Sequence, residues 1–329
     1  MKKILTDTVA KTFSARIGVG AYIMFSLMAA LGAYLYTLRQ ETILSCPGTG
    51  YGADRYLAYC FATQYGDYDH GAFWFDLEPK VRDLAASAEV LFLGSSRMQF
   101  GFSSDAAAQW FSTAAATYYL MGFAYWENYA FEWPLLKQIT PRAKVYVIDL
   151  DKFFEQTETG PANVVMHDTG AYSRYQRKRV WQLPHRLLCS RLASICGTTE
   201  AFYRSIDTGA YTHTGGENIQ FPVTYDPKID KKMVADYAER GAAFVSSIPV
   251  SRRCVLLTMV PGGSTDTGTA KALAEALGLT LIAPQLRDLS TFDQSHLDRP
   301  SAERWSQAFL DAAAPRIHEC LDASNVVAR

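Results

Sequence analysis

Two short segments of this chain carry the residue types that nucleophilic catalysis needs. Gly94-Ser95-Ser96-Arg97 follows an apolar run, and Asp293-Gln294-Ser295-His296 lies near the C-terminus. An activated serine requires a hydroxyl at a tight turn, an imidazole that takes its proton and a carboxylate that holds the imidazole. An Asp at the third position before a His can supply the last two groups from one segment. The pattern therefore predicts a catalytic triad of Ser96, His296 and Asp293.

A structural role for the two serines is the alternative. Ser95 and Ser96 are also good helix N-cap residues, and on their own they would be interpreted in that way. The Asp293 and His296 pair downstream favours the catalytic interpretation.

The surrounding pattern indicates an α/β fold. Short apolar runs predict strands over 90–93, 116–120, 144–150, 255–260 and 279–282, and helical patterns alternate with them over 105–111, 126–139, 229–246, 267–277 and 301–317. Such alternation is typical of a parallel sheet covered by helices on both faces, a three-layer α/β/α arrangement. Residues 155–230 break the rhythm and are expected to form an insertion over the active face. Ser96 falls just past the end of a predicted strand, where sites of such sheets gather.

The N-terminal part predicts export from the cytoplasm. Residues 17–38 form an uncharged apolar run that, as a helix, would rise about 33 Å and cross a bilayer. Basic residues in 1–16 indicate that this tail stays cytoplasmic and that the rest is exported, to the periplasm in a bacterial cell. A cleaved signal peptide with a small-residue site at 29–33 is the alternative. The segment 39–80 is then juxtamembrane, and 81–329 is the main domain.

Composition and cysteine spacing narrow the classes further. The net charge of −1 lacks the basic surplus that nucleic-acid binding requires. Cys46 with Cys60, and Cys189 with Cys196, can each close a local loop, although six cysteines allow fifteen pairings. Cys254 lies in an apolar run and is expected to be a buried thiol. Without a Cys-x-x-Cys pair, neither a structural zinc site nor another cofactor is expected.

The chain resembles a known superfamily at these motifs. Gly94-Ser95-Ser96 and Asp293-x-x-His296, with this strand spacing, are similar to the SGNH (GDSL-like) hydrolases over about residues 85–320. Within them the chain looks like the membrane-anchored periplasmic branch that O-acetylates exopolysaccharides, including alginate-acetylation and DltD-like proteins. The resemblance implies that Ser96 is the nucleophile and that Gly122 donates its N–H to the oxyanion hole. It also implies a polysaccharide or other glycan acceptor and a multi-span membrane acyltransferase as acyl donor.

The chain departs from the family pattern at two places. Ser95 stands where the family usually has Asp, and the Gly-x-Asn-Asp expected after the third strand is replaced by Asp149-Leu150-Asp151. A carboxylate would repel an oxyanion, so the side-chain oxyanion donor is unassigned. Ser95 and Arg97 flank the nucleophile and are candidates for substrate contact. For Arg97 a salt bridge to one of the two aspartates is the favoured role.

Other polar and aromatic residues carry less weight. The insertion holds His167-Asp168, His185 and His213, which are expected at the surface or in packing. Near Gly122 lies a group of aromatic residues that can stack on a sugar but is expected to be core, namely Tyr118, Tyr119, Tyr125 and Trp126.

Three functions follow from these observations. The first is a periplasmic O-acyltransferase that acetylates a glycan through an acyl-serine. The second is a carbohydrate esterase of the same fold, in which water accepts the acyl group. The third is a catalytically inactive scaffold or polysaccharide-binding component of a secretion complex.

Overall fold

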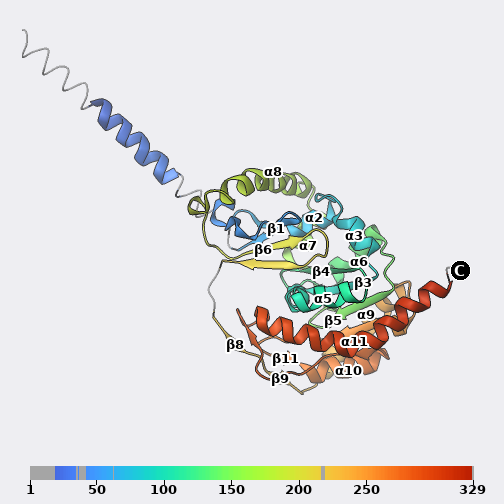
Figure 1. Ribbon diagram of the computed structural model, residues 1–329. Helices are drawn as coiled ribbons and strands as arrows, with labels where there is room; N and C mark the ends of the chain where they lie inside the picture. Colours follow the sequence, from blue (N-terminus) through green and yellow to red (C-terminus); the bar gives the residue numbers. More distant parts are fainter. Residues whose placement is uncertain (1–18, 35, 37–41, 62, 216–218, 328–329) are drawn as a thin grey trace, which may run out of the picture.

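A five-stranded parallel sheet forms the centre of the molecule (Figure 1). The computed structural model describes residues 19–34, 36, 42–61, 63–215 and 219–327. The strands lie in the order β4-β3-β5-β10-β12, which is 2-1-3-4-5 when the sheet's own strands are counted along the chain. Their bounds are Val90–Ser95 (β3), Tyr118–Phe123 (β4), Val145–Asp149 (β5), Val255–Thr258 (β10) and Thr280–Leu281 (β12). The predicted α/β fold with a parallel sheet is confirmed, and the order places a topological switch point between β3 and β5.

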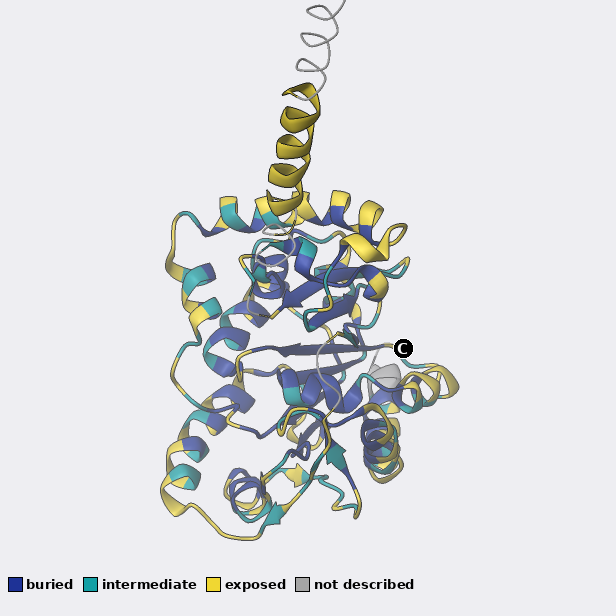
Figure 2. Cartoon of the chain, turned by 90° about the vertical axis from the view of Figure 1, so that its left-hand side faces the viewer, coloured by how far each residue is buried: buried dark blue, intermediate teal, exposed yellow. Residues whose placement is uncertain are grey.

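Helices cover both faces of this sheet. Because successive side chains of a strand point to opposite faces, β3 sends Leu91 and Leu93 into one core and Val90 and Phe92 into the other. The first core is closed by α3 (Val81–Ser87), α6 (Tyr129–Ile139), α9 (Lys231–Ser247) and α10 (Thr267–Leu277). The second is closed by α4 (Ser96–Phe102), α5 (Asp105–Thr113) and α11 (Arg299–Val327). Between these layers β3, β4, β5 and β10 are buried throughout, whereas the edge strand β12 is partly exposed (Figure 2).

The predicted elements agree with the structure in kind and differ at several ends. The helix predicted over 267–277 has the bounds of α10. By contrast, the strand predicted over 116–120 runs as β4 to Phe123, so Gly122 lies inside the strand rather than after it. The strand predicted over 255–260 ends at Thr258 as β10. An apolar run therefore marks a strand, but main-chain pairing with its neighbours sets where the strand ends.

A second, antiparallel sheet joins two parts of the chain that are far apart in sequence. Its order is β2-β1-β6-β7. β1 (Arg55–Cys60) and β2 (Gly66–Asp67) come from the segment predicted as juxtamembrane, and β6 (Ala201–Ser205) and β7 (Tyr211–Thr214) come from the insertion. Sequence analysis did not foresee this sheet, because the pairing of β1 with β6 spans many intervening residues. Two further helices, α7 (Gly160–His167) and α8 (Ala171–Cys189), belong to the insertion, and α2 (Asp69–Trp74) follows β2.

Two short ribbons tie the end of the insertion to the loops of the main sheet. β8 (Phe221–Pro222) pairs with β13 (Ser290–Thr291), and β9 (Tyr225–Asp226) pairs with β11 (Thr265–Asp266). A bridge between Thr291 and Leu297 closes the loop that carries Asp293 and His296. These ribbons therefore hold the predicted Asp–His segment at the edge of the main sheet.

Three disulfides use all six cysteines. The local pairs Cys46–Cys60 and Cys189–Cys196 are confirmed. The prediction of a buried Cys254 thiol was wrong, because Cys254 is bonded to Cys320 of α11. Cys320 lies in the amphipathic C-terminal helix, and only the packing of α11 on the sheet brings the two cysteines together.

The N-terminal predictions fall largely on residues that are not described. The tail 1–16 lies wholly outside the described residues, and the predicted span 17–38 lies partly outside them. Residues 19–34 are helical, with exposed apolar side chains. Among the helices in the described part of the chain, none has both the length and the hydropathy that a bilayer span requires, so the predicted transmembrane helix is not supported.

Candidate active site

The turn from β3 to α4 places Ser96 at the carboxyl end of β3, a strand inside the sheet between β4 and β5. β3 ends at Ser95 and α4 begins at Ser96. Ser95 is the N-cap of α4, where its hydroxyl accepts a hydrogen bond from the Arg97 N–H at 3.2 Å. Gly94 has φ of +152°, and a Cβ there would lie 3.0 Å from the Asp149 Cβ. The turn therefore requires glycine both for its conformation and for its space.

The Asp293–His296 segment folds back on itself. One carboxylate oxygen of Asp293, Oδ1, accepts the N–H groups of Ser295 and His296 at 3.0 and 2.8 Å. The other, Oδ2, lies 2.6 Å from His296 Nδ1. The main-chain carbonyl of Gln294 accepts the Gly263 N–H at 2.8 Å, which fixes the loop to the segment after β10. Asp293 is thus held in a position that orients the imidazole.

The fold brings the three predicted triad residues together. His296 Nε2 lies 2.8 Å from Ser96 Oγ, and its Nδ1 lies on Asp293. With the Nδ1 proton donated to the carboxylate, Nε2 is the nitrogen that can accept the serine proton. The side chain of His296 is 13% exposed and that of Asp293 is 34% exposed, so the group is partly open to solvent. This arrangement can activate the Ser96 hydroxyl for attack on an acyl carbon.

The electrostatics of Asp293 suit the role of an ionised orienting group. Burial alone would raise its pKa, but the hydrogen bond and charge of His296, with the two backbone N–H groups, hold the pKa below its ordinary value. A carboxylate that receives several hydrogen bonds is stabilised in its charged form. Asp293 therefore remains an acceptor for the Nδ1 proton across the neutral range.

The expected oxyanion role of Gly122 is not supported. Its N–H donates to Gln99 Oε1 at 3.0 Å, and its carbonyl accepts a short hydrogen bond from Arg204. Gly122 lies opposite Gly94 in the sheet, and a Cβ there would approach the Ser95 carbonyl oxygen to 2.5 Å. This glycine therefore serves close packing between β3, β4 and α4, and its amide is already engaged.

Arg97 has the structural role that was favoured for it. Its guanidinium lies 3.1 Å from Asp151 Oδ1 and packs against Gly262, where a Cβ would meet Arg97 Cζ at 2.9 Å. Asp149 is buried and accepts the Val260 N–H at 3.0 Å. Burial and repulsion from Asp151 raise the pKa of Asp149 to about 8. Asp151 is thus paired with Arg97, and Asp149 holds the main chain after β10.

An aromatic wall runs from the triad to the surface of the second sheet. The His296 ring packs on Phe100 at 4.7 Å between centroids, and Phe100 packs on Phe202 of β6 at 5.0 Å. Phe202 stacks on Tyr59 at 5.5 Å, and Tyr59 meets Tyr125 at 5.6 Å. Phe202 and Tyr59 belong to the second sheet, whereas Phe100 belongs to α4 and Tyr125 follows β4. The segment predicted as juxtamembrane and the insertion therefore form one side of the site together.

The predicted aromatic platform divides into two parts. Tyr118 and Tyr119 are core, as expected. For Tyr125 and Trp126 the expectation of core was wrong, because they are 44% and 55% exposed beyond the end of β4. Both have positive φ, of 67° and 53°, and Lys152 lies over the Trp126 ring at 5.4 Å. Exposed aromatic residues in an unfavourable backbone conformation are a feature of binding sites.

The histidines of the insertion contribute little to proton transfer. His167 pairs with Glu158 at the surface. His213 stacks on Phe292 at 4.5 Å, and Phe292 in turn stacks on His296 at 5.6 Å. His213 also pairs with Glu200 at 3.0 Å. It is therefore part of the aromatic wall behind the His296 imidazole.

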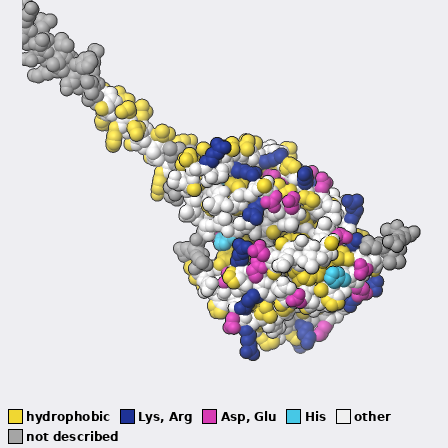
Figure 3. Space-filling model, in the orientation of Figure 1, with side chains coloured by type: hydrophobic (Ala, Val, Ile, Leu, Met, Phe, Trp, Pro, Cys, Tyr) yellow, Lys and Arg dark blue, Asp and Glu magenta, His cyan; other side chains and the backbone are white. Residues whose placement is uncertain are grey.

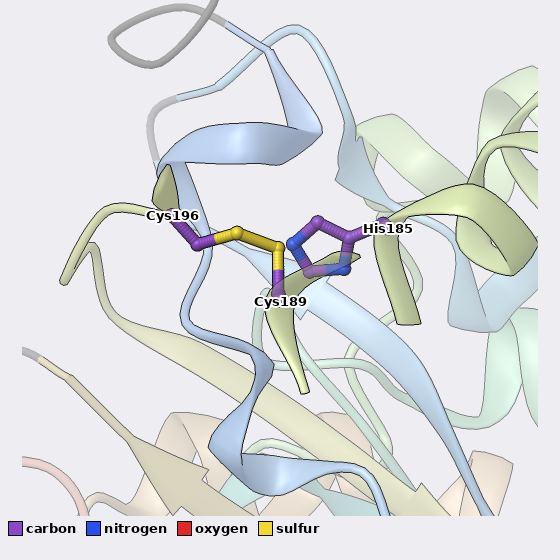
Figure 4. Close-up of side chains that lie close together, drawn as sticks. All are labelled: His185, Cys189 and Cys196. Carbon is purple, nitrogen blue, oxygen red and sulfur yellow. A yellow bond between two sulfur atoms is a disulfide. The ribbon is translucent and has the colours of Figure 1, made fainter. Parts of the chain in front are cut away.

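One cluster has the appearance of a metal site but is occupied by a disulfide. Ligand atoms of His185, Cys189 and Cys196 lie within 4.8 Å of one another. Figure 4 shows that the two sulfurs are bonded to each other, so neither is a thiolate ligand. The ring nitrogens of His185 lie 2.9 Å from the Tyr51 hydroxyl and 3.0 Å from the Cys46 carbonyl oxygen. The cluster therefore anchors α8 to the segment around Cys46.

Sequence analysis missed a second histidine with a similar setting. His70 is buried, with Nδ1 2.8 Å from Asp67 and Nε2 2.8 Å from Glu127. The sequence does contain a signal for this histidine, because Asp67 and His70 have the same Asp-x-x-His spacing as Asp293 and His296.

No family model, curated protein or solved structure matches this chain. The class that the fold and geometry define is therefore an α/β protein with a serine, histidine and aspartate in hydrogen-bonded sequence at the carboxyl edge of its parallel sheet.

Proposed function

We propose that this protein is an SGNH-like O-acyltransferase that transfers an acyl group, in the first instance acetyl, to a glycan hydroxyl. The observation that carries the proposal is the continuous contact from Ser96 Oγ through His296 to Asp293, at 2.8 and 2.6 Å. The sheet order 2-1-3-4-5, with Ser96 at its switch point, also supports the SGNH-like assignment.

The reaction has two balanced steps. Ser96 Oγ attacks the carbonyl carbon of the donor ester while its proton passes to His296 Nε2. The donor alcohol leaves with that proton, and an acyl-Ser96 ester remains. A glycan hydroxyl then gives its proton to His296 Nε2 and attacks the ester carbon, and Ser96 recovers the proton as it leaves. Asp293 stabilises the imidazolium that forms in each step.

Two further observations support the substrate class and the compartment. Tyr125 and Trp126 offer exposed ring faces of the kind on which sugar rings stack, and Tyr125 is linked to His296 by the aromatic wall. All six cysteines are in disulfides, which persist in oxidising compartments such as the periplasm. The disulfides support a proposed location outside the cytoplasm, where a multi-span membrane acyltransferase would supply the acyl donor.

A serine-directed phosphonylating probe tests the chemistry of the site without knowledge of the substrate. We expect one adduct on Ser96, identified by mass spectrometry of the labelled peptide. The Ser96→Ala variant should lose the adduct, whereas Ser95→Ala, which removes the neighbouring hydroxyl, should retain it. Labelling of a different residue, or no labelling of a folded protein, would contradict the proposal and favour a scaffold.

An acceptor assay then separates transfer from hydrolysis. A chromogenic acetyl ester is incubated with the protein, with and without a glycan acceptor. A transferase should release the chromophore faster with the glycan and should leave acetyl on it, while Ser96→Ala does neither. Release that is unaffected by glycan would identify an esterase instead. Tyr125→Ala and Trp126→Ala should raise the acceptor KM and leave hydrolysis without acceptor unchanged.

A further inference from the structure

Helix α8 and the turn after it form a basic segment without acidic residues. From 169 to 199 the sequence has no Asp or Glu, whereas the whole chain has a net charge of −1. The same stretch holds six basic residues, Arg174, Arg177, Lys178, Arg179, Arg186 and Arg191. Such a strong local bias in a nearly neutral chain indicates an anionic partner for this surface.

The outer side of α8 is also apolar. The inner side packs on the domain, where Gln182 is hydrogen-bonded to the main chain of Leu57 and Tyr175 to Asp67. The outer side carries large apolar residues that are between 42% and 67% exposed, namely Val180, Trp181, Leu183, Leu187, Leu188, Leu192 and Ile195. Exposure of so many large apolar side chains on one helix and turn marks an interaction surface rather than ordinary surface variation. We call the exposed residues of 177–195 the α8 face.

The position of the α8 face in the molecule indicates what covers it. The chain enters the folded domain beside α8, where the Gly197 N–H donates to the Leu44 carbonyl at 2.7 Å and His185 bonds to Cys46. The preceding helix over 19–34 has exposed apolar residues along its length, including Phe25 (73%) and Met28 (66%). Figures 1 and 2 both show this helix approaching the domain on the side of α8. Basic and hydrophobic side chains gather on that end of the domain in Figure 3.

We infer that the α8 face binds the surface of an anionic phospholipid bilayer. The helix would lie in the plane of the interface, with Trp181 and the leucines at the boundary of headgroups and acyl chains. The arginines would extend their apolar stems along this boundary and place their guanidinium groups on lipid phosphates. An apolar protein partner would not require a stretch of 169–199 without a carboxylate. This inference does not depend on the triad or on the proposed acyl transfer.

The test measures the depth of Trp181 in a membrane. The full chain is reconstituted in vesicles of phosphatidylcholine with phosphatidylglycerol, in which part of the lipid is brominated near the headgroup end of the acyl chains. The difference in fluorescence quenching between the unaltered chain and Trp181→Phe isolates Trp181 from the other tryptophans. We expect it to be quenched in anionic vesicles, and less in phosphatidylcholine alone or at high salt. Trp110→Phe is the control, because Trp110 lies on α5 beside His318 of α11 and its contribution should not be quenched.

Charge-reversal variants show whether the arginines carry the interaction. The triple variant Arg177→Glu, Arg179→Glu, Arg191→Glu should lose most of the Trp181 quenching, since each basic residue near an anionic surface strengthens binding about fivefold. The matched control reverses the same number of exposed charges at Lys228, Lys231 and Lys232 and should retain the quenching. An unquenched Trp181 in anionic vesicles would overturn the inference. Trp181 quenching that the arginine variant and high salt leave unchanged would also overturn it. So would shielding of the α8 face from solvent that occurs only when a membrane protein is added.

Discussion

Two histidines in this molecule share a sequence pattern and differ in what they can do. His296 and His70 each follow an aspartate in an Asp-x-x-His segment, and each places Nδ1 on that aspartate, at 2.6 and 2.8 Å. The second ring nitrogen makes the difference. Nε2 of His296 faces the hydroxyl of Ser96, whereas Nε2 of His70 faces the carboxylate of Glu127.

This one exchange of partner decides the chemistry. Burial opposes a charge on His70, but its two carboxylate neighbours outweigh burial and raise the pKa of His70 to about 10. His70 is therefore a cation at neutral pH, with both nitrogens donating protons, and it cannot take a proton from a substrate. His296 has one carboxylate partner and an Nε2 that can accept a proton. The comparison teaches that a histidine becomes a base only where its second nitrogen faces a proton donor.

The two histidines also differ in their burial and in the residues that pack around them. His70 is fully buried and packs between Phe123 and Phe131 at 5.2 and 4.9 Å. Tyr175 and Thr159 donate hydrogen bonds to its two carboxylate partners, so the cluster joins α2 to α8 and to the segments before α6 and α7. His70 thus holds the second sheet region against the main domain, while His296 lies at an accessible edge.

The largest expected effect is on activity at the accessible histidine. His296→Ala should lower kcat on an acetyl ester by up to about 10⁶-fold, because Ser96 then lacks a base. His70→Phe should leave kcat per folded molecule within a small factor of the unaltered value. Steady-state kinetics, normalised to the concentration of folded protein by circular dichroism, measures both. Equal losses in the two variants would erase the functional distinction between the sites.

Removal of the orienting charge should have the next largest effect. Asp293→Asn should reduce kcat by about 10⁴-fold, because an amide can hold the wrong tautomer of His296. The protein should remain folded, since Asp293 is one-third exposed. The control is circular dichroism and the unfolding midpoint of the same preparation. Unchanged kcat in Asp293→Asn would remove Asp293 from the proton-transfer chain.

The buried histidine should dominate stability instead. His70→Phe leaves Asp67 and Glu127 without their cation and should lower the free energy of unfolding by about 3–5 kcal/mol. Urea unfolding at neutral pH measures the loss, and His296→Ala is the comparison, for which a smaller loss is expected because the site is partly open. A loss in His70→Phe no larger than in His296→Ala would show that the buried cluster is not a structural ion network.

The pH dependence of stability should also separate the two sites. The pKa of His70 rises from its ordinary value of 6.5 to about 10 in the folded protein. The contribution of His70 to the free energy of unfolding is therefore fully present below about pH 6.5 and is lost as the pH rises through about 10. The reason is that the folded state binds one more proton than the unfolded state between these two pH values. The difference in unfolding free energy between the unaltered chain and His70→Phe should shrink over this range. A difference that is constant from pH 7 to 10.5 would contradict a charged His70.

The smallest effect is expected beside the nucleophile. Ser95→Ala removes the N-cap of α4 and should lower stability by about 1 kcal/mol. The activity should persist, since Ser96, His296 and Asp293 keep their contacts. Thermal unfolding with kinetics on the same sample measures both quantities. A loss of activity as large as that of Ser96→Ala would give Ser95 a direct role that its capping bond does not explain.

Sequence alone determined the parts of this protein that depend on local pattern. Apolar runs of strand length alternating with amphipathic stretches fix an α/β sheet, and the glycine before Ser95 and Ser96 marks the turn that lifts Ser96 from β3. The local disulfides Cys46–Cys60 and Cys189–Cys196 were likewise within reach of spacing arguments. These features depend on neighbours within a few residues, and so the linear order of residues contains them.

Only the tertiary structure decided which residues from distant segments meet. The Asp-x-x-His pattern occurs twice, and nothing in its spacing tells the base from the buried cation. That choice depends on Ser96 reaching His296 and on Glu127 reaching His70 across the fold. For the same reason, the sequence could not predict the disulfide between Cys254 and Cys320 or the hydrogen bond that the Gly122 amide donates to Gln99. The chemistry of a side chain is set by its second partner, and packing alone brings that partner to it.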